Sequence, residues 1–426
     1  MLISFSLENW RSFRDRAEFS MVATRERQFV RRLMTVSRRP KVIRLLPTSA
    51  IFGGNAAGKS NLINAIAQAR AFIVQKSEII GDNAIRLAIP FALDKRCASK
   101  PSAFAFSILV NVGGKEKVFD YSFSVTREAV VDERLVRSDF KGNECVIFDR
   151  NAEAGELFSD SPESDRVKFV LKGTRKDRLF LSNAVEQNVR ELEPVFHWFR
   201  DCLHIVRPES KYIPANELSG GDSLNAFGSL LGQYDTGIKS VRLDSIPSGA
   251  IGLEGNLPSG VMFRIDLGQG RICMASNNGG EVACRELRAM HRDADGSDIQ
   301  FSFADESDGT RRLVDILPMM QTLLNTSGHV FIVDELDRSI HPNLMERMLQ
   351  DYLTAIGEDS RSQLIFTTHD TNLLDQQTIR RDESWIVERA ADGSSNLCAI
   401  SDFRLRKDAD IRKGYLIGRF GGVPRV

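Results

Sequence analysis

A glycine-rich segment near the N-terminus has the residue types and the spacing that bind phosphate groups. Residues 53–60 read GGNAAGKS and fit G-x-x-x-x-G-K-[ST], with an apolar run before them and a helix-forming run after them. Glycines let the backbone N–H groups of such a loop converge on a phosphate at the positive end of the following helix. Lys59 would neutralise two phosphates, and the hydroxyl of Ser60 would bind Mg²⁺. The predicted nucleotide-binding residues here are Gly53, Gly54, Asn55, Ala56, Ala57, Gly58, Lys59 and Ser60.

Two adjacent acids follow a second apolar run, VFIV at residues 330–333. Asp334 and Glu335 would therefore stand at the C-terminal end of a strand, where ligands bind in open α/β sheets. Asp334 can hold Mg²⁺ directly or through water, and Glu335 can accept a proton from an attacking water. An acidic pair after a strand is common, but together with the glycine-rich loop it predicts hydrolysis of a nucleoside triphosphate.

A third polar group follows the apolar run QLIF at residues 363–366. The sequence continues TTHD, so a strand ending here would place the imidazole of His369 at the same sheet edge as the acids. We expect His369 to hydrogen-bond the terminal phosphate of a bound nucleotide. The other five histidines, at positions 197, 204, 291, 329 and 341, are expected to pack or to lie on the surface.

A serine and a glycine precede a helix-forming run in ESDGT, residues 306–310. A helix N-terminus with such residues forms an anion site, so Ser307 and Gly309 are predicted to contact phosphate. A second candidate, LSGGD at residues 218–222, lies much farther from Asp334 and does not lead directly into a helix and strand. Position in the chain therefore favours Ser307 and Gly309, and we interpret residues 218–222 as a loop.

These polar positions need elements that meet at one edge of a sheet. After residue 300, helix and strand patterns alternate, which implies a parallel sheet covered by helices. Residues 103–136 alternate around a GGK turn and predict an antiparallel meander. Residues 206–300 are rich in glycine and serine with short apolar runs, and we expect an inserted, lid-like region there. Further strands are expected at 3–7, 17–21, 49–52, 329–333 and 363–367, and helices at 60–75, within 165–200, at 311–324 and at 343–356.

The composition indicates a globular chain without a charge bias. Of 426 residues, 57 are Lys or Arg and 57 are Asp or Glu, so the net charge gives no nucleic-acid footprint. The basic stretch from Arg25 to Arg44 contains a single acid, Glu26, and we interpret it as a solvated loop. No apolar run approaches the length of a membrane span, and the six cysteines lack metal-ligand spacing. We therefore expect a cytoplasmic protein without disulfides, zinc or membrane contact.

The order of these motifs resembles that of the ABC-ATPase superfamily: phosphate-binding loop, distant signature, acid pair, D-loop and switch histidine. Within it, ENWRSF at residues 8–13 is similar to an N-terminal element of RecF and SMC-like proteins, and Asn61 after the loop agrees. The resemblance implies that Arg11 reaches the nucleotide and that Asp337 belongs to a D-loop at a dimer seam. It implies an α/β P-loop NTPase fold, an ABC-type ATPase head with a mixed sheet, an antiparallel β subdomain and a helical or loop insertion.

The chain is more closely similar to the AAA and ABC-type ATPases of bacterial abortive-infection and phage-defence systems. The residues that carry this resemblance read IPF at 89–91, DTGI at 235–238, ESDGT at 306–310, DELD at 334–337, TTHD at 367–370 and GRFG at 418–421. The signature departs from the superfamily pattern by reading SDGT rather than SGGQ, and no glutamine suitable for a Q-loop is found near residues 80–100.

The resemblance also implies a mechanism and partners. Two protomers, or a higher homo-oligomer, would enclose ATP and Mg²⁺ between the loop of one subunit and Ser307 and Gly309 of another, and slow hydrolysis would open the assembly. The chain shows no set of acids for a nuclease, so the expected effector is a separate nuclease or toxin. The expected halves of the ATPase domain are residues 1–165 and 301–426, with residues 166–300 as the insertion.

Two alternatives remain open from the sequence. One is a DNA-repair ATPase that clamps DNA as RecF or SMC proteins do, although the interval from Ser60 to Ser307 has no sustained heptads and so excludes a long SMC arm. The other is a scaffold that binds ATP without turnover, against which Glu335 and His369 argue.

Overall fold

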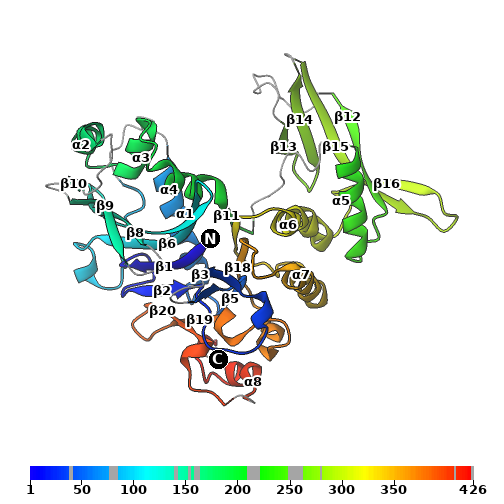
Figure 1. The fold of residues 1–426 in the computed structure, drawn as a ribbon. Helices are drawn as coiled ribbons and strands as arrows, with labels where there is room; N and C mark the ends of the chain where they lie inside the picture. Colours follow the sequence, from blue (N-terminus) through cyan, green and yellow to red (C-terminus); the bar gives the residue numbers. More distant parts are fainter. Residues whose placement is uncertain are drawn as a thin grey trace. The chain divides into compact units, whose positions relative to one another are not determined.

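The structure is a computed structural model in which two compact units can be described. It describes residues 1–37, 42–75, 85–138, 143–151, 155–157, 164–208, 221–247, 262–278, 281–406 and 409–423. Unit 1 comprises residues 1–207, 326–336 and 353–426, and unit 2 comprises residues 208–325 and 337–352 (Figure 1).

The central sheet of unit 1 has six strands in the order β11-β17-β18-β5-β19-β20. All neighbouring strands are parallel except β19 and β20. Every residue of β5, β17 and β18 is buried, as expected for parallel strands covered on both faces. Their bounds are β11 Leu203–Val206, β17 Val330–Val333, β18 Gln363–Thr367, β5 Thr48–Phe52, β19 Ser384–Arg389 and β20 Ser395–Ala399. This topology confirms the expected α/β fold class with a mixed, mainly parallel sheet.

A second, antiparallel sheet of unit 1 has the order β10-β9-β8-β7-β6-β1-β2. The turn between β6 and β7 places Gly113 and Gly114 at φ 60° and 79°, the backbone that a two-residue hairpin turn requires. The expected meander and the two N-terminal strands are both confirmed. The bounds are β1 Leu2–Glu8, β2 Ala17–Ser20, β6 Ser102–Val112, β7 Lys115–Val125, β8 Val130–Ser138, β9 Glu144–Asn151 and β10 Gly155–Leu157.

One helix of unit 1, α1 (Lys59–Val74), carries the main apolar face of the core. Its buried residues Leu62, Ile66 and Ile73 belong to one hydrophobic cluster with residues of both sheets. The other helices of unit 1 are α2 Ser164–Gly173, α3 Phe180–Glu186, α4 Glu193–His197, which continues into a π-helical turn at Trp198–Cys202, and α8 Ile411–Leu416. A two-stranded sheet, β3 Met34–Ser37 with β4 Ile43–Leu45, completes the unit.

Unit 2 contains more regular structure than the sequence pattern indicates. Its five-stranded sheet has the order β12-β15-β14-β13, with β16 paired to β15. The elements are α5 Asp222–Gln233, β12 Ser240–Ile246, β13 Met262–Asp266, β14 Ile272–Asn278, β15 Glu281–Arg292, β16 Asp298–Ser302, α6 Asp308–Asn325 and most of α7 Pro342–Ala355. This division groups the helices of residues 164–202 with the antiparallel sheet and α6 with unit 2. The boundaries expected from the sequence were residues 165 and 300.

The described part of the chain contains no helix that combines the length and the apolarity needed to cross a membrane. All six cysteines are free thiols.

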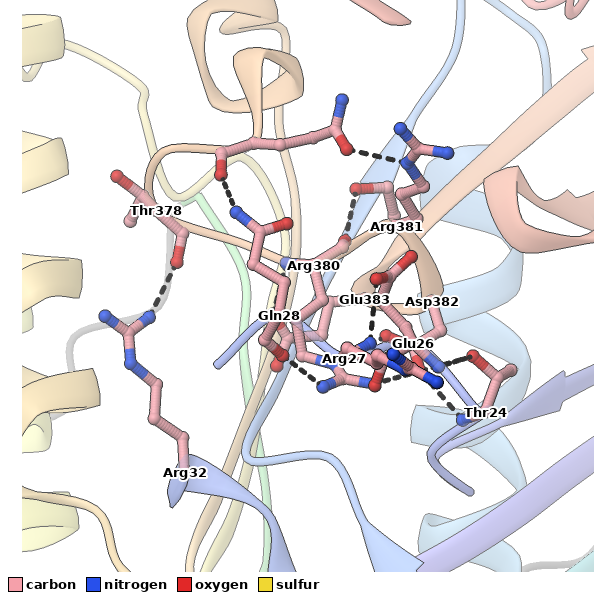
Figure 2. A network of polar contacts seen from close by, with 12 residues as sticks. Thr24, Glu26, Arg27, Gln28, Arg32, Thr378, Arg380, Arg381, Asp382 and Glu383 are labelled. Carbon is pink, nitrogen blue, oxygen red and sulfur yellow. Dashed lines mark hydrogen bonds and ion pairs between the residues drawn. The ribbon is translucent and has the colours of Figure 1, made fainter. Parts of the chain in front are cut away.

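The basic stretch near the N-terminus is tied to the segment that follows β18. Figure 2 shows Arg380 between this stretch and Asp382. The guanidinium of Arg380 is fully buried, donates twice to Asp382 at 2.7 Å, and also donates to the carbonyl oxygens of Gln28 and Glu26. Asp382 accepts from the backbone and the hydroxyl of Thr24 at 2.7 and 2.8 Å. The stretch is therefore anchored on one side, while its side chains at positions 25, 27 and 31 are exposed as expected for a solvated face.

The same network contains a carboxyl group whose protonation couples to folding. Burial raises the pKa of Glu383 to about 8, from its ordinary value of 4.5. The folded chain then holds a proton that the unfolded chain releases, so this contribution to stability is complete below pH 4.5 and is lost as the pH rises through 8.

We expect Glu383→Gln to flatten the decline in stability between pH 5 and pH 8. The slope of the unfolding free energy against pH should differ from that of the unaltered chain by at most about 1.4 kcal/mol per pH unit, the value for one proton. Urea unfolding followed by tryptophan fluorescence at several pH values measures it. Glu128→Gln, at an exposed turn, is the control, and equal slopes for all three proteins would contradict the assignment.

Candidate functional site

The three chemical motifs of unit 1 meet at one edge of the central sheet. Strand β18 lies between β5 and β17, and all three run parallel. Thr367 pairs with Ile51 of β5, and Phe366 pairs with Val333 of β17, so the three strands end at the same level. The glycine-rich loop, the acid pair and His369 follow directly from these ends. The sheet order thus brings together the residues that the sequence predicts.

The backbone of the glycine-rich loop leaves no room for side chains at two positions. Gly53 and Gly58 have φ values of 155° and 116°, which other residues rarely adopt. A Cβ atom on Gly53 would lie 2.4 Å from the carbonyl oxygen of Val387, and one on Gly58 would lie 2.3 Å from the hydroxyl of Ser395. The loop is therefore held in a tight turn against β19 and β20.

The loop ends at the N-terminus of α1, where the first backbone N–H groups of a helix lack helical partners. No side chain caps this terminus, because its N-cap residue is Gly58. Lys59 is only 6% exposed, and its ammonium group donates to the carbonyl oxygens of Gly53 and Gly54 at 2.7 and 3.3 Å. Ser60 is exposed at the rim. The N-terminus of α1, the buried Lys59 and the accessible hydroxyl of Ser60 are the groups that bind a triphosphate with its Mg²⁺ in such loops.

The acid pair lies on a tight turn after β17. Asp334 is 6% exposed, and Glu335 has a left-handed backbone with φ 52°. The hydroxyl of Thr367 donates to Oδ1 of Asp334 at 2.6 Å, and the backbone N–H of Glu335 donates to the same hydroxyl at 2.7 Å. In the described part of the chain, no three His, Cys, Asp or Glu side chains are grouped to hold a metal alone. Asp334 and Ser60 carry oxygen atoms, the kind of ligand that Mg²⁺ takes together with substrate phosphates and water.

The predicted switch histidine lies just beyond β18 and is exposed at the sheet edge. The two residues before it are buried and connect it to both neighbouring strands. The backbone N–H of Thr368 donates to the carbonyl oxygen of Ile51 of β5 at 3.1 Å, and the hydroxyl of Thr368 accepts from the backbone N–H of Asp370 at 3.0 Å. The backbone that carries His369 is thereby held while its imidazole stays accessible.

The N-terminal element contacts the glycine-rich loop through Arg11 and Ser12. The guanidinium of Arg11 donates to Asn61 at 3.4 Å, and Asn61 donates to the hydroxyl of Ser12 at 2.8 Å. The backbone N–H of Arg11 donates to Ile89 at 2.8 Å, so the IPF segment lies beside it. Arg11 thus lies next to Asn61, the residue that follows Ser60, and its approach to the nucleotide stays a prediction.

Ser395, which the sequence analysis did not single out, also contacts both the glycine-rich loop and the N-terminal element. The hydroxyl of Ser395 on β20 donates to the carbonyl oxygen of Ala57 at 2.6 Å, and its backbone N–H donates to Ser12 at 2.7 Å. Ser395 therefore links the loop to the N-terminal element. No local motif marks it, since it follows an ordinary turn between two strands near the C-terminus.

The residues on either side of the late GRFG segment pack near the strands that carry the loop. The hydroxyl of Tyr415 donates to the carbonyl oxygen of Gly422 at 3.0 Å, and its ring lies 6.2 Å from that of Phe52 at the end of β5. A Cβ atom on Gly422 would lie 2.6 Å from Ile386 of β19. Tyr415 and Gly422, which flank the GRFG segment, thus pack against β5 and β19.

The signature residues belong to unit 2 and stand at the start of α6. The hydroxyl of Ser307 accepts from the backbone N–H of Thr310 at 3.1 Å, which makes Ser307 the N-cap of an 18-residue helix. A Cβ atom on Gly309 would lie 2.7 Å from the carbonyl oxygen of Ser339, so glycine lets the segment after Asp337 approach closely. Of the alternative LSGGD segment, residues 218–220 lie outside the described residues. Asp222 begins helix α5, in which Leu224, Phe227 and Leu231 are buried, so the expectation that this segment does not lead directly into a helix was wrong.

A comparison with protein families identifies the chain. The family model described as "AAA domain, putative AbiEii toxin, Type IV TA system" matches residues 49–375, which is well over half of the chain. The chain belongs to this AAA family. The matched range starts in β5, which carries the phosphate-binding loop, and ends after His369, so it includes the loop, the signature residues, the acid pair and the histidine. The N-terminal element, Ser395 and the GRFG segment lie outside it. Membership confirms the predicted resemblance to AAA and ABC-type ATPases in an abortive-infection context.

Solved structures similar to this AAA-family protein include three SMC head domains. One is an SMC head bound to the C-winged helix domain of ScpA, with 15% identity, a TM-score of 0.39, and coverage of 93% of this chain and 97% of that one. The SMC head domain from Thermotoga maritima has 13% identity, a TM-score of 0.36, and coverage of 93% and 98%. An Smc head with an extended coiled coil, bound to the C-terminal domain of ScpA derived from Pyrococcus furiosus, has 13% identity, a TM-score of 0.38, and coverage of 93% and 96%. No curated protein matches the chain.

Proposed function

We propose that this AAA-family protein is a Mg²⁺-dependent ATPase that closes as a homodimer around ATP and, on hydrolysis, releases an effector protein. The observation that carries the proposal is the convergence of three motifs at the ends of three adjacent parallel strands. β18, which ends before His369, separates the strand that leads to Lys59 from the strand that leads to Glu335. A phosphate group, a cation and a proton acceptor can therefore be held in one place.

Each residue has a role that follows from its position. Lys59 would exchange its two carbonyl partners for phosphate oxygens, which keeps the ammonium group paired in both states. Bound Mg²⁺ would supply positive charge to the phosphate oxygens, held by Asp334 and Ser60. Glu335 would accept a proton from the attacking water, and His369 would donate a hydrogen bond to the terminal phosphate.

The dimer is proposed because the glycine-rich loop is open on one side. Asn55, Ala56 and Ser60 are exposed, although the rest of the loop is packed against β19 and β20. Ser307 and Gly309 of a second subunit, at the N-terminus of α6, would provide the positive end of a long helix to cover the phosphates. A twofold dimer uses the same patch on both subunits and so forms two such sites, with Asp337 at the seam.

The effector is proposed to be a separate nuclease or toxin, held or released according to the nucleotide state. Support comes from the family description, which names a toxin and a toxin–antitoxin system. The terminal phosphate would bridge the two subunits only while it is intact, so hydrolysis would change the assembly that the effector contacts.

Lys59→Ala tests the nucleotide site directly. We expect ATP affinity to fall by about 10- to 100-fold, since a hydrogen bond to a charged group contributes about 1.5–3 kcal/mol. Isothermal titration calorimetry measures the affinity, and Lys172→Ala, an exposed lysine near the end of α2, is the matched control. ATP binding by Lys59→Ala as tight as that of the unaltered chain would refute the proposed site.

A further inference from the structure

Thr367, the last residue of β18, makes three hydrogen bonds to one short turn. Its hydroxyl donates to Oδ1 of Asp334 at 2.6 Å and accepts from the backbone N–H of Glu335 at 2.7 Å. Its carbonyl oxygen accepts from the backbone N–H of Leu336 at 3.1 Å. Thr367 is fully buried, so these contacts are shielded from water. The turn that carries Asp334 and Glu335 is therefore held by hydrogen bonds from the neighbouring strand β18 as well as by its own strand β17.

The direction of these hydrogen bonds is determined by chemistry. The backbone N–H of Glu335 can only donate, so the threonine oxygen accepts from it, and the single hydroxyl hydrogen remains for Asp334. Oδ1 of Asp334 thereby accepts a hydrogen bond from the neighbouring strand β18, which fixes the orientation of the carboxylate. One hydroxyl thus orients the carboxylate that would hold the metal.

The same hydroxyl supports the backbone of the proposed proton acceptor. Glu335 has φ 52°, a left-handed conformation that residues with side chains adopt at a cost. The backbone N–H of Glu335 donates to the hydroxyl of Thr367, and the backbone N–H of Leu336 donates to its carbonyl oxygen. Thr367 therefore stabilises the turn that positions the Glu335 side chain. On the far side, the backbone N–H of Asp334 donates to Val206 of β11 at 2.8 Å.

We propose that Thr367 is a positioning residue of the ATPase site, which orients Asp334 toward Mg²⁺ and holds the turn that presents Glu335. This inference rests on the proposed function. Residues that hydrogen-bond a metal ligand typically change metal affinity or activity about 10- to 100-fold when they are removed. Because the side-chain hydrogen bonds of Thr367 go to Asp334 and Glu335 and not to the glycine-rich loop, binding of the nucleotide without metal should not depend on its hydroxyl.

The test compares Thr367→Val, which keeps the branched shape, with Thr367→Ser, which keeps the hydroxyl. Thr48→Val is the matched control, because Thr48 is equally buried, lies at the opposite end of the adjacent strand β5, and also uses its hydroxyl in a hydrogen bond, to Leu364 at 2.8 Å. Two quantities are measured at varied Mg²⁺ concentration: the rate of ATP turnover, and the thermal stabilisation produced by the non-hydrolysable analogue AMP-PNP. Binding of the analogue in EDTA is measured separately.

For Thr367→Val we expect a fall in kcat or a rise in the half-saturating Mg²⁺ concentration of about 10- to 100-fold. Analogue binding in EDTA should be unchanged, Thr367→Ser should restore most of the loss, and Thr48→Val should resemble the unaltered chain in both metal readouts. A Thr367→Val protein with the Mg²⁺ dependence and kcat of Thr48→Val would overturn the inference while leaving the ATPase proposal intact. No ATP turnover by the unaltered chain would instead count against the proposed function.

Discussion

Glu335→Gln is expected to reduce ATP turnover by about 100- to 10,000-fold, the contribution typical of a general base. The amide keeps the shape of the side chain and the hydrogen bond from the backbone of residue 335 to Thr367, so the turn should survive. ATP affinity should therefore stay within about threefold of the unaltered chain, because a proton acceptor for water acts on the transition state and not on bound ATP. Phosphate release under single-turnover conditions and calorimetric titration measure the two quantities.

The same variant examines the proposed dimer. With hydrolysis blocked, the closed state should accumulate, so light scattering during gel filtration should show a dimer with ATP and Mg²⁺ but a monomer without nucleotide. Glu128→Gln, at an exposed turn between β7 and β8, should hydrolyse ATP normally and should not trap the dimer. If Glu335→Gln hydrolysed ATP at a rate within a few-fold of that of the unaltered chain, Glu335 would not be the general base.

Glu133→Ala is expected to destabilise unit 1 by roughly 3–5 kcal/mol, the cost of breaking a buried charge network. Glu133 is fully buried on β8 and accepts four hydrogen bonds. They come from the hydroxyl of Tyr121 at 2.9 Å, the backbone N–H groups of Phe180 and Leu181 at 2.5 and 2.9 Å, and Arg150 at 3.4 Å. Without the carboxyl group, the start of α3 loses its anchor on the antiparallel sheet and Arg150 is left as a buried charge.

Tryptophan fluorescence can measure the stability of unit 1 separately from that of unit 2. The chain has three tryptophans, at positions 10, 198 and 385, and all belong to unit 1. Urea unfolding followed by tryptophan fluorescence therefore reports on the unit that contains Glu133. Glu144→Ala, an exposed position on the neighbouring strand β9, should change stability by no more than about 0.5 kcal/mol. A similarly small change for Glu133→Ala would show that the network does not hold α3.

Local sequence patterns determined the chemistry and most elements of unit 1. Residues 53–60 were recognisable because a glycine-rich loop followed by Lys and Ser meets the steric and charge demands of a triphosphate within one short segment. The strand at residues 363–367 and the helix after the loop were predictable because buried runs and helical periodicity depend on near neighbours alone.

The sheet of unit 2 escaped prediction for a physical reason. Its longest strand, β15, reads EVACRELRAMHR, where charged residues interrupt the apolar alternation. Glu286 of this strand is nevertheless buried, because Arg271 and Arg288 pair with its carboxylate at 2.8 and 2.9 Å. A strand that buries charge through partners elsewhere in the chain does not show the hydrophobic pattern by which strands are recognised.

Contacts between distant segments were decided by the tertiary structure. The sequence placed the acid pair and His369 at strand ends, but only the sheet order, with β18 between β5 and β17, brings the hydroxyl of Thr367 to Asp334. Likewise, Ser395 reaches Ala57 because β19 joins β5 and β20 joins β19. Motif spacing reflects the chemistry of a few neighbouring residues, whereas strand order depends on how the whole chain buries its apolar surface.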